Sequence, residues 1–179
     1  MLEDYSSAYG LNSVRLRYFN AAGADPSGVI GEAHDPETHL IPNILKSILT
    51  NNDVGLKIFG NDYNTPDGTC VRDYVHINDI CNAHLKAMDY LDTHTGSHAF
   101  NLGNGAGFSV LDVIKAAETV TEQTISYTIE ARRAGEPPTL VADSTQAQQT
   151  LNWQPEYNNM IDIIKTAWGW HKSHENGNK

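Results

Sequence analysis

The chain has 179 residues, which is enough for one domain with a sizeable core. Apolar residues make up 40% and charged residues 19%, a composition typical of soluble globular proteins. The 22 acidic residues outnumber the 12 basic ones and give a formal net charge of −10, which argues against a general nucleic-acid binder or a binder of anionic membranes.

No targeting segment or membrane span is predicted. The N-terminus is acidic and lacks the apolar core of a signal peptide. The longest apolar stretch, residues 40–49, is far shorter than the roughly 20 residues that a membrane span needs. Cys70 and Cys81 have neither a metal-binding nor a redox spacing, so we expect two reduced thiols in a cytoplasmic protein. The eight histidines are scattered, and we expect no metal site.

The first third of the chain predicts a helix, a strand, a long loop and a second helix. Residues 1–10 are amphipathic at helical spacing, and residues 13–19 alternate apolar and polar side chains as a strand does. Residues 20–37 are rich in Gly and Pro and predict an irregular loop of a length that is usually functional or disordered. Apolar residues at helical spacing predict a helix over residues 40–49.

The most informative stretch follows a short predicted strand over residues 56–59. Residues 61–69 are so dense in Asn, Asp, Gly and Pro that a ligand or a fixed geometry is indicated. A strand around residues 71–77 comes next, and its alternation places Arg72 and Tyr74 on one side and Asp73 on the other.

The remaining elements follow from capping and apolar spacing. A helix capped by Asn78 or Asp79 is predicted to about residue 90, then a strand over 98–102, and a helix whose cap is Ser109 with Asp112 three residues later. A strand over 125–129, a short helix from Asp143 or Ser144 to Leu151 and a last helix over 160–173 complete the prediction. The inward residues expected on the helix after residue 77 are Ile80, Ala83, His84, Ala87 and Met88.

Strands and helices alternate along the chain, which predicts the α/β class. The predicted strands are few for a free-standing doubly wound sheet, and several would have unpaired edges. We therefore expect a part of a larger fold.

Three groups of residues allow a structural and a functional interpretation. The glycines of residues 103–107 follow a strand and precede a helix, but their Gly-x-Gly-x-Gly spacing favours a tight connection over a dinucleotide-binding turn. Arg132 and Arg133 suit either an anionic ligand or a solvated surface pair. Arg72 suits either an internal ion pair or a phosphate group. No nucleophile–base pair stands out.

Eight sequence blocks together resemble the C-terminal half of the UDP-glucose 4-epimerases, members of the extended short-chain dehydrogenase/reductase family. These blocks span nearly the whole chain: Leu16–Asn20, His39–Pro42, Ile58–Tyr63, Thr65–His76, Asn101–Gly103, Arg132–Glu136, Ala142–Asp143 and Leu151–Trp153. The insertion over residues 62–69 is specific, because related sugar-nucleotide enzymes usually have a shorter link there.

The resemblance implies an NAD-dependent isomerase that interconverts UDP-glucose and UDP-galactose through a 4-keto intermediate. It implies the C-terminal part of a Rossmann-type fold, a homodimer and a place in galactose and nucleotide-sugar metabolism. In that family the glycine-rich NAD turn, the catalytic Ser or Thr and the Tyr-x-x-x-Lys pair belong to the N-terminal half. None of these motifs occurs here, so we expect no catalytic residue in these 179 and no activity of the chain alone.

The resemblance also implies roles for individual residues. Tyr18 would lie near the nicotinamide, and Leu140 would gate the sugar pocket. The expected nucleotide-sugar ligands are Asn20, Arg72 and Arg133 for the diphosphate, Lys57, Ile58 and Phe59 for the uracil, Tyr74 and Leu40 beside the nucleotide, Glu136 for a ribose hydroxyl, and His39, which stands where other members carry Asn.

Two alternatives stay open. The chain is either part of the enzyme or a non-catalytic module that binds UDP-sugars. The sugar is either a hexose or another group, such as an N-acetylhexosamine, a pentose or a uronate. Leu140 is intermediate in size between the tyrosine and the cysteine of other members, which predicts a preference for UDP-glucose and UDP-galactose with weak acceptance of the N-acetyl forms.

Overall fold

The structure is a computed structural model that describes residues 1–50 and 55–175. Its elements in chain order are α1 (Leu2–Tyr9), β1 (Ser13–Tyr18), β2 (Asn20–Ala22), α2 (Leu40–Leu49), β3 (Leu56–Phe59), β4 (Val71–Arg72), β5 (Tyr74–His76), α3 (Ile77–Leu91), β6 (Ser97–Leu102), β7 (Phe108–Ser109), α4 (Val110–Thr121), β8 (Tyr127–Glu130), β9 (Thr139–Leu140), α5 (Thr145–Leu151) and α6 (Met160–Glu175).

The strands form four small sheets, in which parallel pairing predominates. β1 pairs with β6, β2 with β5 and β3 with β8, each in parallel, and β4 lies between antiparallel β7 and parallel β9. This mixed arrangement of helices and parallel strands confirms the predicted α/β class.

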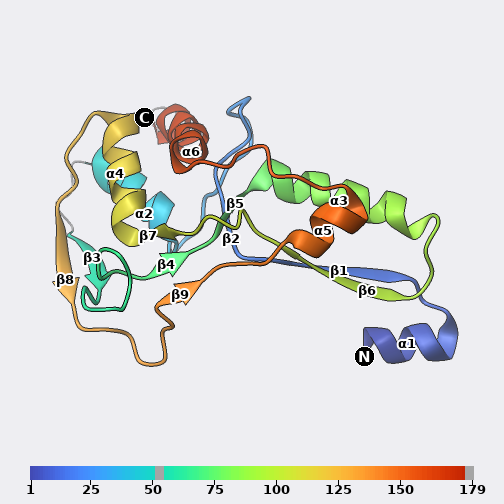
Figure 1. Cartoon of the computed structure of the whole chain (residues 1–179). Helices are drawn as coiled ribbons and strands as arrows, with labels where there is room; N and C mark the ends of the chain where they lie inside the picture. The colour runs from blue at the N-terminus through green and yellow to red at the C-terminus, as the bar shows by residue number, and fades with distance from the viewer. Residues whose placement is uncertain (51–54, 176–179) are drawn as a thin grey trace.

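The elements gather into two groups joined through β2 and β5, as Figure 1 shows. In the first group α3 and α5 cover one face of the β1–β6 pair (Figure 1). Its core contains Phe100, Leu102 and Trp153, all almost fully buried. Burial of side chains of this size contributes roughly 1.5–3 kcal/mol each, so these contacts hold the layer of helices on the strands.

The second group is built from α2, α4 and α6, which pack on one another beside β3 and β8 (Figure 1). Its core includes Ile44 and Leu45 of α2 and Ile163 and Ile164 of α6, none of which is measurably exposed. The apolar residues predicted at helical spacing over 40–49 are therefore the buried face of α2. α4 begins with the predicted capping box, in which Ser109 accepts from the Asp112 amide and the Asp112 carboxylate accepts from the Ser109 amide.

The predicted continuous strand over residues 71–77 is wrong. The chain forms β4 and β5 in two different sheets, and Asp73 between them turns its carboxylate into the glycine connection after β6. The alternation itself is confirmed, because Asp73 is buried on one side while Arg72 and Tyr74 line a common cleft on the other.

Two expectations for α3 are also wrong. Its N-cap is His76, whose ring nitrogen Nδ1 accepts from the Asn78 amide at 3.1 Å, rather than Asn78 or Asp79. His84 and Met88 are exposed and do not face inward, because β1 and α5 cover only one side of the helix. Ile80, Ala83 and Ala87 are buried as predicted.

The loop over residues 61–69 has a fixed geometry of its own. The Tyr63 amide donates to the Gly68 carbonyl at 2.9 Å, and Asp67 accepts from the amide and hydroxyl of Thr69 and from the Ser109 hydroxyl. Gly68 has φ +81°, and a Cβ there would lie 2.0 Å from the Asn61 carbonyl oxygen, so this turn requires glycine. Within the described residues, no helix is long and apolar enough to span a bilayer.

Candidate functional site

Two adjoining clefts lie where the two groups of elements meet. The first, here called the strand-end cleft, has a volume of about 550 Å³ and starts at Tyr18 and Phe19, where β1 ends. The second, here called the arginine cleft, has a volume of about 600 Å³ and is bordered by Arg72 and Arg133. Asn20, His39, Leu40 and Tyr74 line both clefts, so the two are parts of one continuous depression.

The arginine cleft collects most of the residues that the sequence singled out. Ten of the twelve line it: Asn20, His39, Leu40, Lys57, Ile58, Phe59, Arg72, Tyr74, Arg133 and Glu136. Tyr18 lines the strand-end cleft and is half exposed. Leu140 lines neither cleft; it is 45% exposed and stands beside Arg72 in the register of β9 and β4.

The two neighbouring arginines of the loop after β8 have different surroundings. Arg132 is paired with Asp62, with Nε 2.6 Å from the carboxylate, and lies over the Tyr63 ring. Arg133 instead stacks over the Phe59 ring, with its guanidinium carbon 4.0 Å from the ring centroid. Among the described residues, no carboxylate lies within ion-pair distance of Arg133, so its N–H donors are available to an anion.

Arg72 is held at the base of the same cleft. Its Nη2 donates to Glu136 Oε1 at 2.9 Å and its Nη1 to the Val71 carbonyl at 2.8 Å. The internal ion pair left open by the sequence is therefore present, with a glutamate as the partner. A guanidinium has five N–H donors, so these two bonds leave others for a ligand. Glu136, expected to accept from a ribose hydroxyl, holds Arg72 in this structure.

Tyr74 and Asn20 form the boundary between the clefts. Burial raises the pKa of Tyr74 to about 12, so its phenol is neutral at physiological pH and can donate a hydrogen bond. The Asn20 side-chain amide donates to the Asp73 carbonyl at 2.7 Å, which ties the start of β2 to the link between β4 and β5. Asn20 thus satisfies the Asp73 carbonyl and also lines both clefts.

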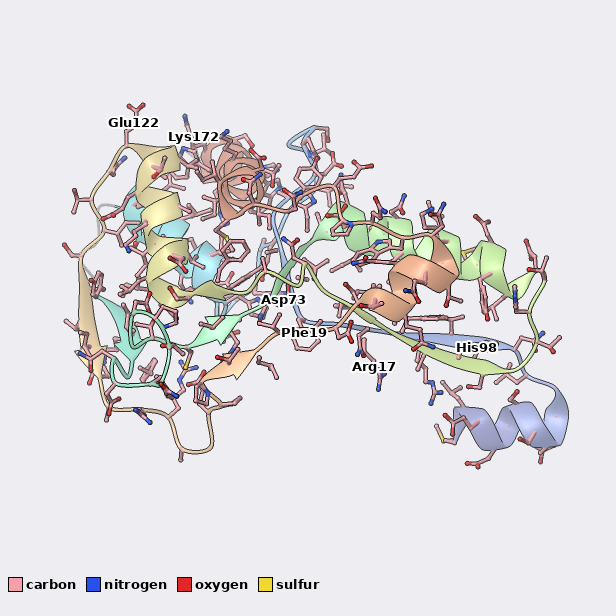
Figure 2. All side chains as sticks on the ribbon, in the orientation of Figure 1. Arg17, Phe19, Asp73, His98, Glu122 and Lys172 are labelled. Atoms are coloured by element: carbon pink, nitrogen blue, oxygen red, sulfur yellow. The ribbon has the colours of Figure 1, made fainter. Side chains whose placement is uncertain are left out.

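The glycine connection after β6 is structural. The amides of Asn104 and Gly105 donate to the Asp73 carboxylate at 2.8 and 3.1 Å, so they are not free to bind phosphate. A Cβ on Gly103 would lie 2.5 Å from that carboxylate, which shows how closely the loop approaches it. Figure 2 shows Asp73 at the junction of the two groups of elements. The interpretation as a tight connection accounts for these contacts.

One face of α2 lines the arginine cleft, and this was not predicted from the sequence. Besides His39, the residues Asn43, Lys46 and Thr50 line the cleft. These positions are spaced by four, three and four residues, which places them on one side of a helix. The same periodicity that identifies the apolar face of α2 could therefore have identified this polar one.

The fold and the clefts together define an α/β protein with a cation-lined ligand cleft that opens at the end of a parallel strand, where open α/β sheets bind ligands. The chain belongs to the NAD dependent epimerase/dehydratase family, whose characteristic sequence pattern matches residues 1–103.

Two curated relatives carry the same name. The chain is 52% identical over 170 residues to the UDP-glucose 4-epimerase of Lacticaseibacillus casei, covering 95% of this chain and 51% of the relative. It is 50% identical to the UDP-glucose 4-epimerase of Halalkalibacterium halodurans, again over 95% and 51%. The chain thus spans about half the length of the curated relatives it matches.

Solved structures show the same fold. A crystal structure of UDP-glucose 4-epimerase superposes with a TM-score of 0.94 at 47% identity, covering all of this chain and 54% of that one. The Bifidobacterium longum enzyme in complex with NAD⁺ and UDP superposes with a TM-score of 0.89 at 35% identity, covering 97% of this chain and 51% of that one.

Proposed function

We propose that this chain is the UDP-sugar-binding half of an NAD-dependent UDP-glucose 4-epimerase. The observation that carries the proposal is the convergence of Arg72, Arg133 and Phe59 in one cleft, from positions up to 74 residues apart in the sequence. Guanidinium groups match the oxygens of a diphosphate, and an aromatic ring beside them offers a surface for a base. The names of the relatives supply the identity of the nucleotide and the sugar.

In this proposal the residues of the arginine cleft bind and orient the substrate. Arg133 and Arg72 bind the diphosphate, and Asn20 donates to it with the second N–H of its side-chain amide. Lys57, Ile58 and Phe59 surround the uracil ring, Leu40 and Tyr74 flank the nucleotide, and Glu136 accepts from the ribose. His39 contacts the ligand from the start of α2.

The sugar would extend toward the strand-end cleft, where Tyr18 lies beside the place proposed for the nicotinamide. NAD, when bound, accepts and returns the hydride at C4 of the hexose. The residues of this chain hold the sugar nucleotide in place for that exchange. Leu140 lines neither cleft, but it pairs with Arg72 across β9 and β4 and would act on the choice of sugar from that position. Residues 1–179 together would form this binding half.

We further propose that the intact enzyme is a cytoplasmic homodimer with no nucleic-acid or membrane partner. The net charge of −10 supports the absence of nucleic-acid and anionic-membrane partners. α1 buries none of its residues and exposes Tyr5 and Tyr9, whose rings contact each other at a tilt and would suit a protein interface.

Calorimetric titration of the 179-residue chain with UDP tests the proposal. We expect one UDP per chain and about 10- to 100-fold weaker binding for Arg133→Ala, because a charge-assisted hydrogen bond contributes roughly 1.5–3 kcal/mol. Arg17→Ala is the matched control, since this exposed arginine on β1 lines neither cleft and extends from the strand away from α3 and α5 (Figure 2). A folded chain that does not bind UDP, or equal affinities for both variants, would contradict the proposal.

A further inference from the structure

Four side chains of the loop between β2 and α2 converge at the edge of the strand-end cleft, which three of them also line. Glu32, His34, Glu37 and His39, here called the His/Glu cluster, each place one metal-ligating atom so that all four atoms lie within 4.8 Å of one another. Imidazole nitrogens and carboxylate oxygens are ordinary ligands of Zn²⁺. The sequence showed no such site, because the spacing Glu-x-His-x-x-Glu-x-His falls in a segment predicted to be irregular.

The distances within the His/Glu cluster suit a single ion. His34 Nδ1 lies 3.0 Å from Glu32 Oε1 and 3.9 Å from Glu37 Oε1, and His39 Nδ1 lies 3.7 Å from Glu37 Oε1. His39 Nδ1 also forms a hydrogen bond with Glu32 Oε1. Neighbouring ligands of tetrahedral Zn²⁺ are about 3.3–3.6 Å apart, given bond lengths of about 2.0–2.2 Å. The observed distances bracket this range, so small movements would complete the tetrahedron.

Glu37 is positioned in advance. Its side chain is only 6% exposed, and Oε1 accepts from the backbone amides of Thr38 and His39 at 2.9 and 3.0 Å. Its other oxygen, Oε2, lies 3.3 Å from Lys46 Nζ. This ammonium neutralises one of the two carboxylates of the cluster, so Lys46 competes with a bound cation in part.

We propose that Glu32, His34, Glu37 and His39 bind one Zn²⁺ through both Nδ1 atoms and one oxygen of each carboxylate. The ion would fix the loop of residues 32–39 up to His39, the N-cap of α2, and hold the ring of that histidine. Since His39 lines both clefts, the ion would stiffen the wall that they share. The proposal does not depend on the identity of the sugar nucleotide, because Zn²⁺ alone is the probe.

The test is a titration of the chelator-treated 179-residue chain with Zn²⁺, followed by competition with a chromophoric chelator. We expect one Zn²⁺ per chain, and at least tenfold weaker binding for His34→Ala and for Glu32→Gln, because each change removes one of four ligands. His98→Ala is the matched control: this histidine lies on β6 in the other group of elements (Figure 2). It should bind Zn²⁺ as the unchanged chain does. Circular dichroism of each variant verifies that it folds.

Lys46→Met should change the affinity for Zn²⁺ in the opposite direction. Removing the competing ammonium should tighten Zn²⁺ binding, whereas a purely structural role of Lys46 would leave it unchanged or weaken it. Absence of stoichiometric binding would overturn the proposal, and so would equal affinity of His34→Ala and the unchanged chain. In either case the His/Glu cluster is a hydrogen-bonded network of imidazoles and carboxylates without a metal.

Discussion

At the scale of single residues, one buried carboxylate organises the junction of the two groups of elements. Asp73 is fully buried and accepts from the amides of Asn104, Gly105 and Ala142 at 2.8–3.1 Å. These three donors come from two loops that are distant in the sequence. Because Asp73 lies between Arg72 and Tyr74, its contacts also position two residues of the arginine cleft.

We therefore predict that Asp73→Ala lowers the free energy of unfolding by about 3 kcal/mol or more, since each buried amide left without a partner costs about 1–3 kcal/mol. Chemical denaturation of the 179-residue chain measures this loss. Asp89→Ala, at an exposed position of α3, should change stability by no more than about 0.5 kcal/mol. Similar losses in the two variants would show that the Asp73 contacts contribute little.

At the scale of elements, the loop over residues 61–69 acts as a clip between β3, β4 and the start of α4. None of its residues lines either cleft, so its dense hydrogen bonding maintains shape and does not contact the proposed ligand. Asp67 is the central acceptor, because it joins Thr69 of the loop to Ser109, the N-cap of α4. The loop therefore fixes the helix that packs on α6.

The protonation of Asp67 makes this clip sensitive to acid. Burial disfavours its charged form, but hydrogen bonds from Ser109 and Thr69 outweigh that effect and hold its pKa below the usual 3.8. A group with a lowered pKa stabilises the fold above its unfolded pKa, and that contribution is lost as the pH falls through its folded pKa.

We predict that the free energy of unfolding of the unchanged chain falls as the pH is lowered below about 4, and that Asp67→Asn reduces this fall. The variant should also be less stable near neutral pH, by about 1 kcal/mol, because an amide group cannot accept from Ser109 in the same way. Urea denaturation at a series of pH values measures both effects. Identical pH dependence in the two proteins would contradict the role of Asp67, and Asp89→Asn serves as the control.

At the scale of the whole molecule, apolar side chains lie on the outside of several helices. Leu85 and Met88 of α3 are 62% and 66% exposed, and Tyr9 of α1 is exposed as well. Apolar surface of this kind is typical of regions that contact another protein or domain.

We predict that the 179-residue chain with added NAD⁺ does not convert UDP-galactose to UDP-glucose, even where UDP binds. The sequence holds no Tyr-x-x-x-Lys pair to move the proton of the 4-hydroxyl group. Chromatography of the sugar nucleotides after prolonged incubation detects any product, and an intact UDP-glucose 4-epimerase is the positive control. Turnover by the chain alone would overturn this prediction without affecting the UDP-binding proposal.

Local interactions made much of this protein predictable from its sequence. The capping box at Ser109 joins residues three positions apart, and the buried face of α2 follows from helical spacing. Both could therefore be predicted from the sequence alone. The blocks that resemble the epimerases likewise led to residues that now lie in one cleft.

Contacts between distant residues decided the rest. The break between β4 and β5 at Asp73 depends on amides 31 to 69 residues away. The different surroundings of Arg132 and Arg133 depend on Asp62 and Phe59. The His/Glu cluster forms because an irregular loop turns back on the start of α2. No periodicity encodes such encounters, since their energy arises only when the packed elements bring the groups together.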